Sequence, residues 1–389
     1  GLDWLSYLKV RGSWGILGNE RISSNYYPYQ AAINFSTALF FQNGGVISSQ
    51  SASQWAYAVQ DLTWEKTAST DIGVDVNFFD NRLRFTAEWF KKKTSDMLLA
   101  TSIPAYVGFD DPQRNMGKME TKGYELEINW SDRIGDFSYS VGFNFSDAVS
   151  KMTDLGGTEF IGDKVKMKGS EFEEWYGYVS DGLFLTQEDL DNSPKLDNTQ
   201  GIGSVKYKDI SGPDGVPDGK ISPEYDRVLL GGSQPRFLYG GNVSVAYKNV
   251  DLSMAFQGVG RRWVQTHSFM WENRPYFDGH YWSSFNTDEQ NAAAIYPKLS
   301  DTSRTADHKL SDFWLFNGRY FRMKNITVGW TLPKAWTNKV SMSSIRLYVA
   351  GNDLFCISKY PEGWDPETPA SGAVLPVTSS VIFGLQVNF

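Results

Sequence analysis

Apolar and polar residues alternate along many short segments of this 389-residue chain. Between positions 71 and 78, for example, Ile72, Val74 and Val76 alternate with polar residues or glycine. The same period of two recurs in 83–89, 124–130, 137–145, 243–247, 252–256, 326–330, 345–349 and 381–389. Such alternation predicts half-buried β-strands, each with one apolar and one polar face. We therefore expect an all-β, antiparallel fold.

The connections between the expected strands are short and long in turn. Residues 80–81, 132–136 and 248–249 form tight turns of the kind that join neighbouring antiparallel strands. The long excursions cover 95–117, 152–236, 262–318 and 353–378. Outer-membrane barrels have short periplasmic turns and long extracellular loops. The pattern therefore favours a transmembrane antiparallel β-barrel over a soluble β-sandwich.

The last residue, Phe389, continues the apolar face of the segment 381–389. Soluble domains usually end in polar, frayed residues, whereas barrel strands alternate lipid-facing apolar residues with polar ones. We interpret this segment as the closing strand of a barrel. Because it follows a long outer excursion, Phe389 is expected at the periplasmic interface.

Composition agrees with a barrel and excludes some other classes. No run of roughly 20 apolar residues is present, so a helical membrane protein is excluded. The mean hydropathy of -0.39 is compatible with a barrel, which places apolar residues only at alternate positions. A net charge of -8 argues against nucleic acid as a partner. The single cysteine, Cys356, cannot form an internal disulfide.

The first 18 residues lack the basic region, apolar stretch and cleavage site of a signal peptide. An outer-membrane protein must be exported, so we expect this chain to be part of a longer protein. The segments suffice for about 10 to 12 strands at roughly 10 residues per crossing, while large plugged transporters have about 22. Half a barrel would leave two unpaired edges in hydrocarbon. Residues 1–389 are therefore interpreted as the C-terminal half of a 22-stranded barrel.

A series of short motifs runs through the chain in a fixed order. They are LTWEKT at 62–67, followed by strands at 70–79 and 82–94, NMG at 115–117, KGYEL at 122–126, RMKNITVGW at 322–330, RLY at 346–348, NDLF at 352–355 and GWDPE at 363–367. In this order the motifs resemble the C-terminal barrel of SusC/RagA-type TonB-dependent transporters. The resemblance extends over essentially the whole chain.

The resemblance implies an importer in the outer membrane of a Gram-negative bacterium. The absent N-terminal part would carry the signal, the segment that contacts the TonB complex and the plug domain. Cargo would be captured beneath a SusD-like surface lipoprotein and admitted when TonB displaces the plug. Glycan oligosaccharides are the expected cargo and peptides the second possibility. A passive porin and an outer-membrane barrel enzyme are the alternatives.

An acidic, glycine-rich segment at 209–222 is a candidate calcium loop. Ca²⁺ takes six to eight oxygen ligands, and glycines permit the sharp turns that such a loop needs. The predicted ligands are Asp209, Ser211, Asp218 and Asp226, together with the backbone carbonyl of Lys220. The spacing departs from that of an EF-hand, although the family has a similar Asp-rich loop here. The alternative is a solvated turn cluster without metal. A bound ion would have a structural role, and no other cofactor is expected.

The long excursion after position 262 is rich in aromatic residues with polar neighbours. Aromatic rings combined with a few convergent polar groups suit a sugar or peptide pocket. The predicted substrate contacts are Trp271, Tyr276, Phe277, Tyr281 and Trp282. The same residues would also suit loop packing or a partner interface. Polar residues on the lumen side, Asp75, Glu88, Glu125 and Glu127, could contact cargo as well.

No catalytic motif is recognisable. The histidines at 267, 280 and 308 lack metal-ligand spacing and have no accompanying nucleophile motif. Glu173 and Glu174 are adjacent, so on a strand their side chains would point to opposite faces. The sequence therefore predicts a protein that is not an enzyme.

Overall fold

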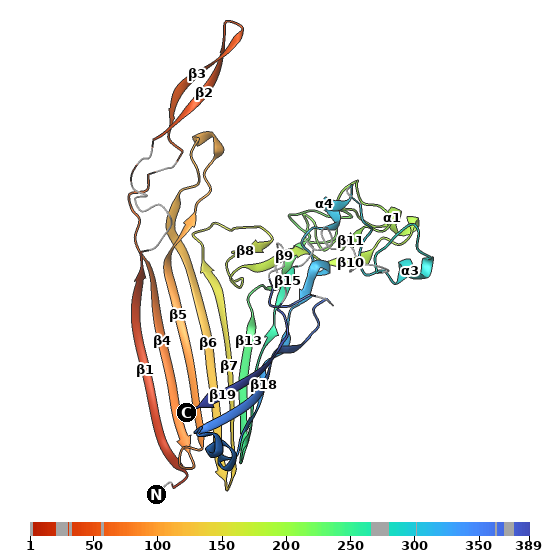
Figure 1. Ribbon diagram of the computed structural model, residues 1–389. Coiled ribbons are helices and arrows are strands. Elements are labelled where there is room, and N and C mark those ends of the chain that lie inside the picture. Colours follow the sequence, from red (N-terminus) through yellow and green to blue (C-terminus); the bar gives the residue numbers. More distant parts are fainter. Residues whose placement is uncertain are drawn as a thin grey trace.

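Ten antiparallel strands form one continuous sheet in the computed structural model (Figure 1). The structure describes residues 3–20, 30, 33–55, 58–265, 280–300, 302–361, 364–368 and 377–389. In spatial order the strands are β1 (Leu5–Asn19), β4 (Glu65–Phe78), β5 (Leu83–Ala100), β6 (Gln113–Ile134), β7 (Phe137–Asp154), β13 (Arg236–Tyr247), β14 (Val250–Arg261), β17 (Tyr320–Thr331), β18 (Ser344–Ser358) and β19 (Ser380–Asn388). The expected all-β, antiparallel fold is therefore confirmed. In the described residues, β1 and β19 form the two edges of the sheet.

The residue pairing places the alternating apolar residues on one face of the sheet. Val76 lies opposite Phe85, and Phe85 lies opposite Ile128 on the next strand. Side chains in such cross-strand pairs touch on the same face, which stabilises the pairing. A shift by one residue would move every apolar side chain to the other face. The sequence pattern thus fixes the register as well as the strands.

Short connections gather at one end of the sheet and long ones at the other (Figure 1). The turn between β4 and β5 has positive φ at Phe79, Asp80 and Asn81, as a tight hairpin requires. Gly135 and Lys248, also with positive φ, serve the turns after β6 and β13. At this same end, α5 (Lys334–Thr337) and η4 (Asn338–Val340) connect β17 to β18. The start of β1 lies there too, opposite the end of β4, as does Phe389, which is 89% exposed.

Two predicted excursions are shorter in the structure because the strands extend into them. β5 continues to Ala100 and β6 begins at Gln113, so the connection in 95–117 shrinks to 101–112, which contains η1 (Ala105–Val107). An irregularity between Thr94 and Met97 lets β5 bend without losing its partner. β18 likewise continues to Ser358.

The structure also contains strands that the alternation did not identify. β1 pairs with β4 along its length. β2 (Asn34–Gln42) and β3 (Gly45–Ser53) form a separate two-stranded hairpin, which projects beyond the loop end of the main sheet (Figure 1).

The excursions 152–236 and 262–318 contain short elements beside the loop end of the sheet (Figure 1). The strands are β8 (Lys164–Val165), β9 (Glu174–Tyr178), β10 (Ser180–Leu183), β11 (Val205–Tyr207), β12 (Arg227–Gly232), β15 (Trp263–Gln265) and β16 (Leu315–Asn317). The helices are α1 (Gln187–Asn192), α3 (Asp288–Ala292), α4 (Arg304–Asp307) and the 3₁₀ turn η3 (Asp312–Trp314). None of the described helices has the length and apolar character needed to cross a bilayer.

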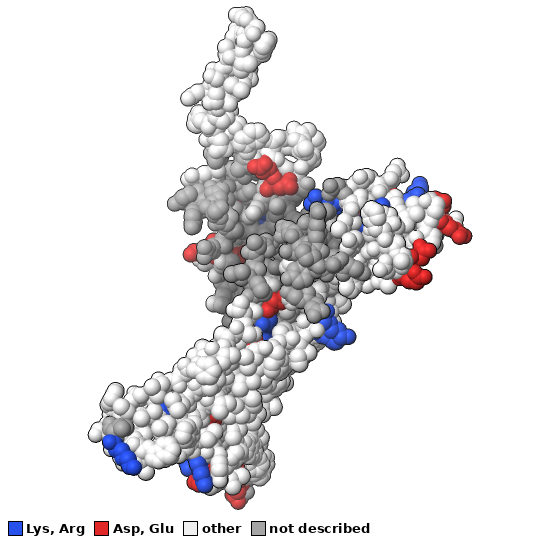
Figure 2. Space-filling model, turned by 45° about the vertical axis from the view of Figure 1, so that its right-hand side comes forward, with Lys and Arg blue, Asp and Glu red and all other residues white. Residues whose placement is uncertain are grey.

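The apolar face of the main sheet is exposed. Its members include Val141, Phe143, Val328, Val349 and Phe383. Figure 2 shows from one side that the surface of the strands carries few charged side chains except near its lower end. An apolar surface of this extent is unusual on a soluble monomer and marks contact with a partner or with lipid.

Candidate functional site

The polar face of the sheet carries paired charges. Arg11 on β1 contacts Glu88 on β5 (Nη1–Oε2 2.6 Å) and Asp75 on β4 (Nε–Oδ2 3.4 Å). Glu88 lies directly opposite Glu125 on β6. A hollow of about 270 Å³ here is lined by Thr86, Glu88, Glu125, Leu126, Glu127, Asn144, Phe145 and Ser146. The predicted lumen-side acids therefore share one surface, and Arg11 is a member that the sequence interpretation missed.

A buried ion cluster fastens a loop segment to the sheet at its loop end. Arg322 on β17 is only 2% exposed, and its Nη2 donates to both carboxylate oxygens of Asp365 at 2.6 Å. Its Nε lies 2.6 Å from Oε2 of Glu367. The other oxygen of Glu367 accepts hydrogen bonds from Tyr320 (2.7 Å) and Gln257 (2.7 Å).

Neighbouring contacts extend this attachment. Arg262 donates to the carbonyl of Pro366 at 2.9 Å. Lys324, two residues after Arg322, pairs with Asp353 on β18 (Nζ–Oδ1 2.6 Å). The structure thus brings together parts of three motifs noted in the sequence, within 322–330, 352–355 and 364–367. Because burial makes an unpaired charge costly, these acids and bases depend on one another.

A second buried pair lies within the sheet and contacts a glutamate of the excursion 152–236. Arg236 on β13 binds Asp147 on β7 through two hydrogen bonds of 2.5 and 2.6 Å. The amide of Phe237 donates to the same carboxylate at 3.1 Å. Glu171, from the excursion, lies 3.6 Å from Arg236 and 3.2 Å from Arg261. Two arginines on the strands therefore anchor one glutamate of the loop.

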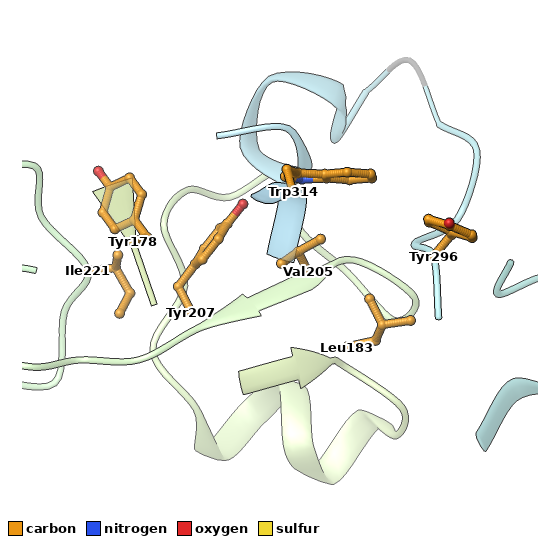
Figure 3. Packing of buried hydrophobic residues seen from close by; sticks show 7 residues of the cluster. All are labelled: Tyr178, Leu183, Val205, Tyr207, Ile221, Tyr296 and Trp314. Carbon is orange, nitrogen blue, oxygen red and sulfur yellow. The ribbon is translucent and has the colours of Figure 1, made fainter. Parts of the chain in front are cut away.

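The two largest excursions pack against each other around one hydrophobic core, which we call the loop domain (Figure 3). The buried members are Tyr178, Leu183, Val205, Tyr207, Ile221, Tyr296 and Trp314. Trp314 is fully buried, and its indole N–H donates to the carbonyl of Asp307 at 2.8 Å. Residues more than a hundred positions apart thus meet in one core, so neither excursion is an independent loop.

Asp307 connects the two excursions through its side chain. Its Oδ1 accepts a hydrogen bond from the amide of Val205 at 3.0 Å. The hydroxyl of Tyr207 reaches back to the carbonyl of Ala306 at 2.8 Å. Burial raises the pKa of the Asp307 carboxyl, because the charged form loses hydration inside the domain.

Two of the five predicted aromatic substrate contacts lie in the described residues. Tyr281 and Trp282 pack against the core of the loop domain, and the amide of Trp282 donates to the carbonyl of Tyr296 at 3.0 Å. The ring of Trp282 covers Gly203, where an added Cβ would lie 2.4 Å from the indole. Both aromatic residues therefore help to hold the domain together. Trp271, Tyr276 and Phe277 lie outside the described residues, and substrate contact stays a prediction for all five.

The predicted calcium loop is closed by Asp226, which is fully buried. Its Oδ1 accepts from the amides of Ile210 (2.7 Å) and Ser211 (3.2 Å), and its Oδ2 accepts from the amide of Ser222 (2.6 Å). A carboxylate with several amide donors already has the partners that burial demands. Asp226 therefore fits a loop anchor better than a metal ligand.

Asp209 and Asp218 differ from Asp226 in this respect. Oδ2 of Asp209 accepts from the amide of Gly219 at 2.6 Å, but its Oδ1 is buried and has no hydrogen-bond partner among the described residues. Asp218 is exposed and accepts only from the amide of Lys220 (3.0 Å) among the described hydrogen bonds. Ser211 directs its hydroxyl toward the carbonyl of Gly212 (3.5 Å). Asp209 Oδ1 is therefore an oxygen without a partner, but the described residues contain no group of three or more Asp, Glu, His or Cys side chains that could hold a metal ion. Calcium binding stays a prediction.

The projecting β2–β3 hairpin is a candidate interaction surface that sequence periodicity missed. On one face of β2, Phe35, Leu39 and Phe41 are all exposed, Phe41 by 77%. No charged residue occurs between positions 22 and 60. An isolated two-stranded hairpin is marginally stable in water, and exposed apolar patches mark binding surfaces. The charge-free run was the signal in the sequence that could have identified it.

Known proteins resemble this chain in sequence. The family model described as TonB dependent receptor-like, beta-barrel matches residues 1–354. The TonB-dependent receptor P3 of Formosa agariphila is 29% identical over 92% of this chain and 36% of its own length. The TonB-dependent receptor SusC of Bacteroides thetaiotaomicron is 25% identical over 99% of this chain and 38% of its own. The chain thus spans about two fifths of the length of these relatives.

A solved structure shares the fold. The RagAB peptide importer in its open-open state aligns with a TM-score of 0.74 and 19% identity, over all of this chain and 41% of the matched one. The relatives are receptors and transporters by name, which agrees with the expectation that the chain is not an enzyme.

Proposed function

This chain belongs to the TonB dependent receptor-like β-barrel family, and from that premise we propose that it is part of the wall of an active importer in the outer membrane. The observation that carries the proposal is the ten-stranded sheet, whose exposed face is apolar and whose other face bears charges such as Arg11 and Glu88. Such a sheet suits lipid on one side and an aqueous lumen on the other. A plug and a TonB-contacting segment would belong to the remainder of the longer protein.

We further propose oligosaccharides as the cargo. Neutral amides accompany the charges on the polar face, and Gly142 lies between Asn129 and Asn242 on the neighbouring strands. Amide groups both donate and accept hydrogen bonds, as sugar hydroxyls require. Peptides are the second possibility, because a transporter of this fold is described as a peptide importer. Uptake of labelled oligosaccharides and peptides by cells with and without the full-length protein would separate the two. Loss of peptide uptake alone would contradict the oligosaccharide assignment.

The partner we propose is a SusD-like surface lipoprotein that contacts the β2–β3 hairpin. Replacing Phe35, Leu39 and Phe41 with serine should abolish or strongly weaken co-purification of the lipoprotein with the full-length protein. The reason is that these side chains supply most of the apolar area on that face. The barrel itself should still insert, since the hairpin lies outside the main sheet.

The matched control is Phe285→Ser with Tyr106→Ser, two residues that are also highly exposed but lie elsewhere. An undiminished complex in the triple hairpin variant would rule out the hairpin as the docking element.

Calcium binding by the acidic loop is proposed in a narrower form, with Asp209 and Asp218 as the carboxylate ligands and the carbonyl of Lys220 beside them. Asp209→Asn should remove any Ca²⁺-dependent rise in the melting temperature, because an amide is a weaker ligand for a hard cation. Asp226→Ala should lower stability in EDTA as well, by about 1–3 kcal/mol, since buried amides lose a charged acceptor. Calorimetry of the full-length protein with Ca²⁺ or EDTA measures both. An Asp209→Asn variant that keeps the full Ca²⁺ effect would exclude this ligand set.

A further inference from the structure

Four lysines gather at the loop end of the apolar face of the main sheet. Lys91 and Lys93 come from β5, Lys122 from β6 and Lys151 from β7. Lys91 lies opposite Lys122, while Lys93 and Lys151 lie on either side of Glu120. We call this group the lysine cluster.

The pairing shows that the cluster shares its face with the lipid-facing side chains. Trp89 and Tyr124 lie opposite each other, two residues before Lys91 and two after Lys122, respectively. Because side chains on a strand alternate between faces, Trp89, Tyr124, Lys91 and Lys122 lie on the same face of the sheet. The register is unbroken between β5 and β6 from Leu83 to Thr94, and Ile128 and Leu126 continue the apolar side toward the short turns. The lysines therefore begin where the apolar band ends.

Aromatic residues mark both limits of this band. Trp89 and Tyr124 are at its loop end, and Trp130, Tyr247 and Trp330 are near the short turns. Tryptophan and tyrosine prefer the level of lipid headgroups, and barrels have such girdles at both interfaces. Lys91 and Lys122 follow the outer girdle directly, which places their ammonium groups at the height of the headgroups.

The cluster has an excess of positive charge. Glu120 lies 2.9 Å from Lys91 and 2.7 Å from Lys122, so it holds two ammonium groups side by side. Lys93 and Lys151 are exposed, and neither forms an ion pair within the part of the chain that the structure describes. The residue bridged to Lys151 on its other side, Glu171, is itself paired with Arg236 and Arg261. The cluster therefore keeps an excess of positive charge, although the protein as a whole is acidic.

We propose that the lysine cluster binds the phosphate-bearing headgroup of a lipid in the outer leaflet. Lysine recognises phosphate as a point charge without a demand for planar geometry, and basic residues beside a membrane boundary attract anionic lipids. A lipid fits better than the lipoprotein partner, because the cluster faces sideways with the apolar band. The β2–β3 hairpin, by contrast, projects beyond the loop end of the sheet, whereas the loop domain lies beside that end (Figure 1). This inference rests on the proposed position of the sheet in the membrane.

The test is lipid binding to the purified full-length protein in neutral detergent, followed by native mass spectrometry. The probes are a phosphorylated glycolipid, the same glycolipid after dephosphorylation, and inorganic phosphate. Substituting glutamine at Lys91, Lys93, Lys122 and Lys151 should weaken binding of the phosphorylated lipid by about tenfold or more. Glutamine at Lys195, Lys208, Lys309 and Lys359, four exposed loop lysines, should leave it unchanged. Dephosphorylated lipid should bind all proteins equally weakly.

A second, milder variant controls for misfolding of the fourfold variant. Lys93→Gln with Lys151→Gln leaves the contacts of Glu120 intact and should still weaken binding. Equal lipid binding by wild type and both cluster variants would overturn the proposal, as would cluster-dependent binding of inorganic phosphate without any effect on lipid. The assay needs neither TonB nor cargo, so its failure is distinguishable from failure of the import function.

Discussion

Replacing Arg322 with methionine is expected to lower the free energy of unfolding by about 3–5 kcal/mol. Methionine keeps an apolar stem of similar reach but removes the guanidinium that faces Asp365 and Glu367. Asp365 is itself buried, so its carboxylate would stay in a poorly hydrated site without a cation. The segment 364–368 should then detach from β14 and β17.

Thermal unfolding of the full-length protein in detergent, together with limited proteolysis, measures both effects. Arg319→Met is the matched control, because Arg319 is exposed and lies just before β17. Adding Asp365→Asn and Glu367→Gln to Arg322→Met should recover part of the loss, since no unpaired charge would then be buried. If Arg322→Met and Arg319→Met behaved alike, the cluster would not be the anchor of this loop.

Trp314→Ala should unfold the loop domain while leaving the strands paired. The indole is fully buried and contacts Tyr296, Phe313 and His308. Removing a buried tryptophan costs about 3–5 kcal/mol, because a large cavity remains. A domain built on one small cluster of buried residues has little stability to spare.

The readouts are proteolysis within 152–236 and the heat-dependent migration of the folded barrel on gels. The variant should be cleaved rapidly in the loop domain yet retain the migration of a folded barrel. Phe285→Ala, at a position that is 97% exposed, serves as the control. Loss of the barrel along with the domain would show that the two fold as one unit.

Most of the main sheet was predictable because one physical rule governs it. Each strand has one apolar and one polar face, so the alternation in segments such as 124–130 on β6 shows which residues share a face with those of the neighbouring strand. The alternating connections predicted that long and short connections lie at opposite ends of the sheet, which the structure confirms (Figure 1). β1 was missed since glycines at 12, 15 and 18 and Leu17 weaken its alternation. β2 and β3 were missed because apolar residues such as Phe40 and Phe41 occupy both faces of the hairpin.

The site was less predictable, because its contacts join distant positions. Arg322 meets Asp365 across 43 residues, and Val205 meets Asp307 across 102. No local pattern marks such pairs. The acidic loop shows a related limit, because its composition identified the carboxylates but not their roles. Only the structure shows that backbone amides bind Asp226, whereas Oδ1 of Asp209 has no hydrogen-bond partner among the described residues.

The central claim is that this chain belongs to an importer driven by TonB, and uptake with and without TonB tests it most directly. Cells that produce the full-length protein and the proposed lipoprotein partner would be given a labelled oligosaccharide, in matched strains with TonB intact or deleted. We predict uptake that requires both the protein and TonB. Equal uptake in the two strains would identify a passive pore and contradict the account.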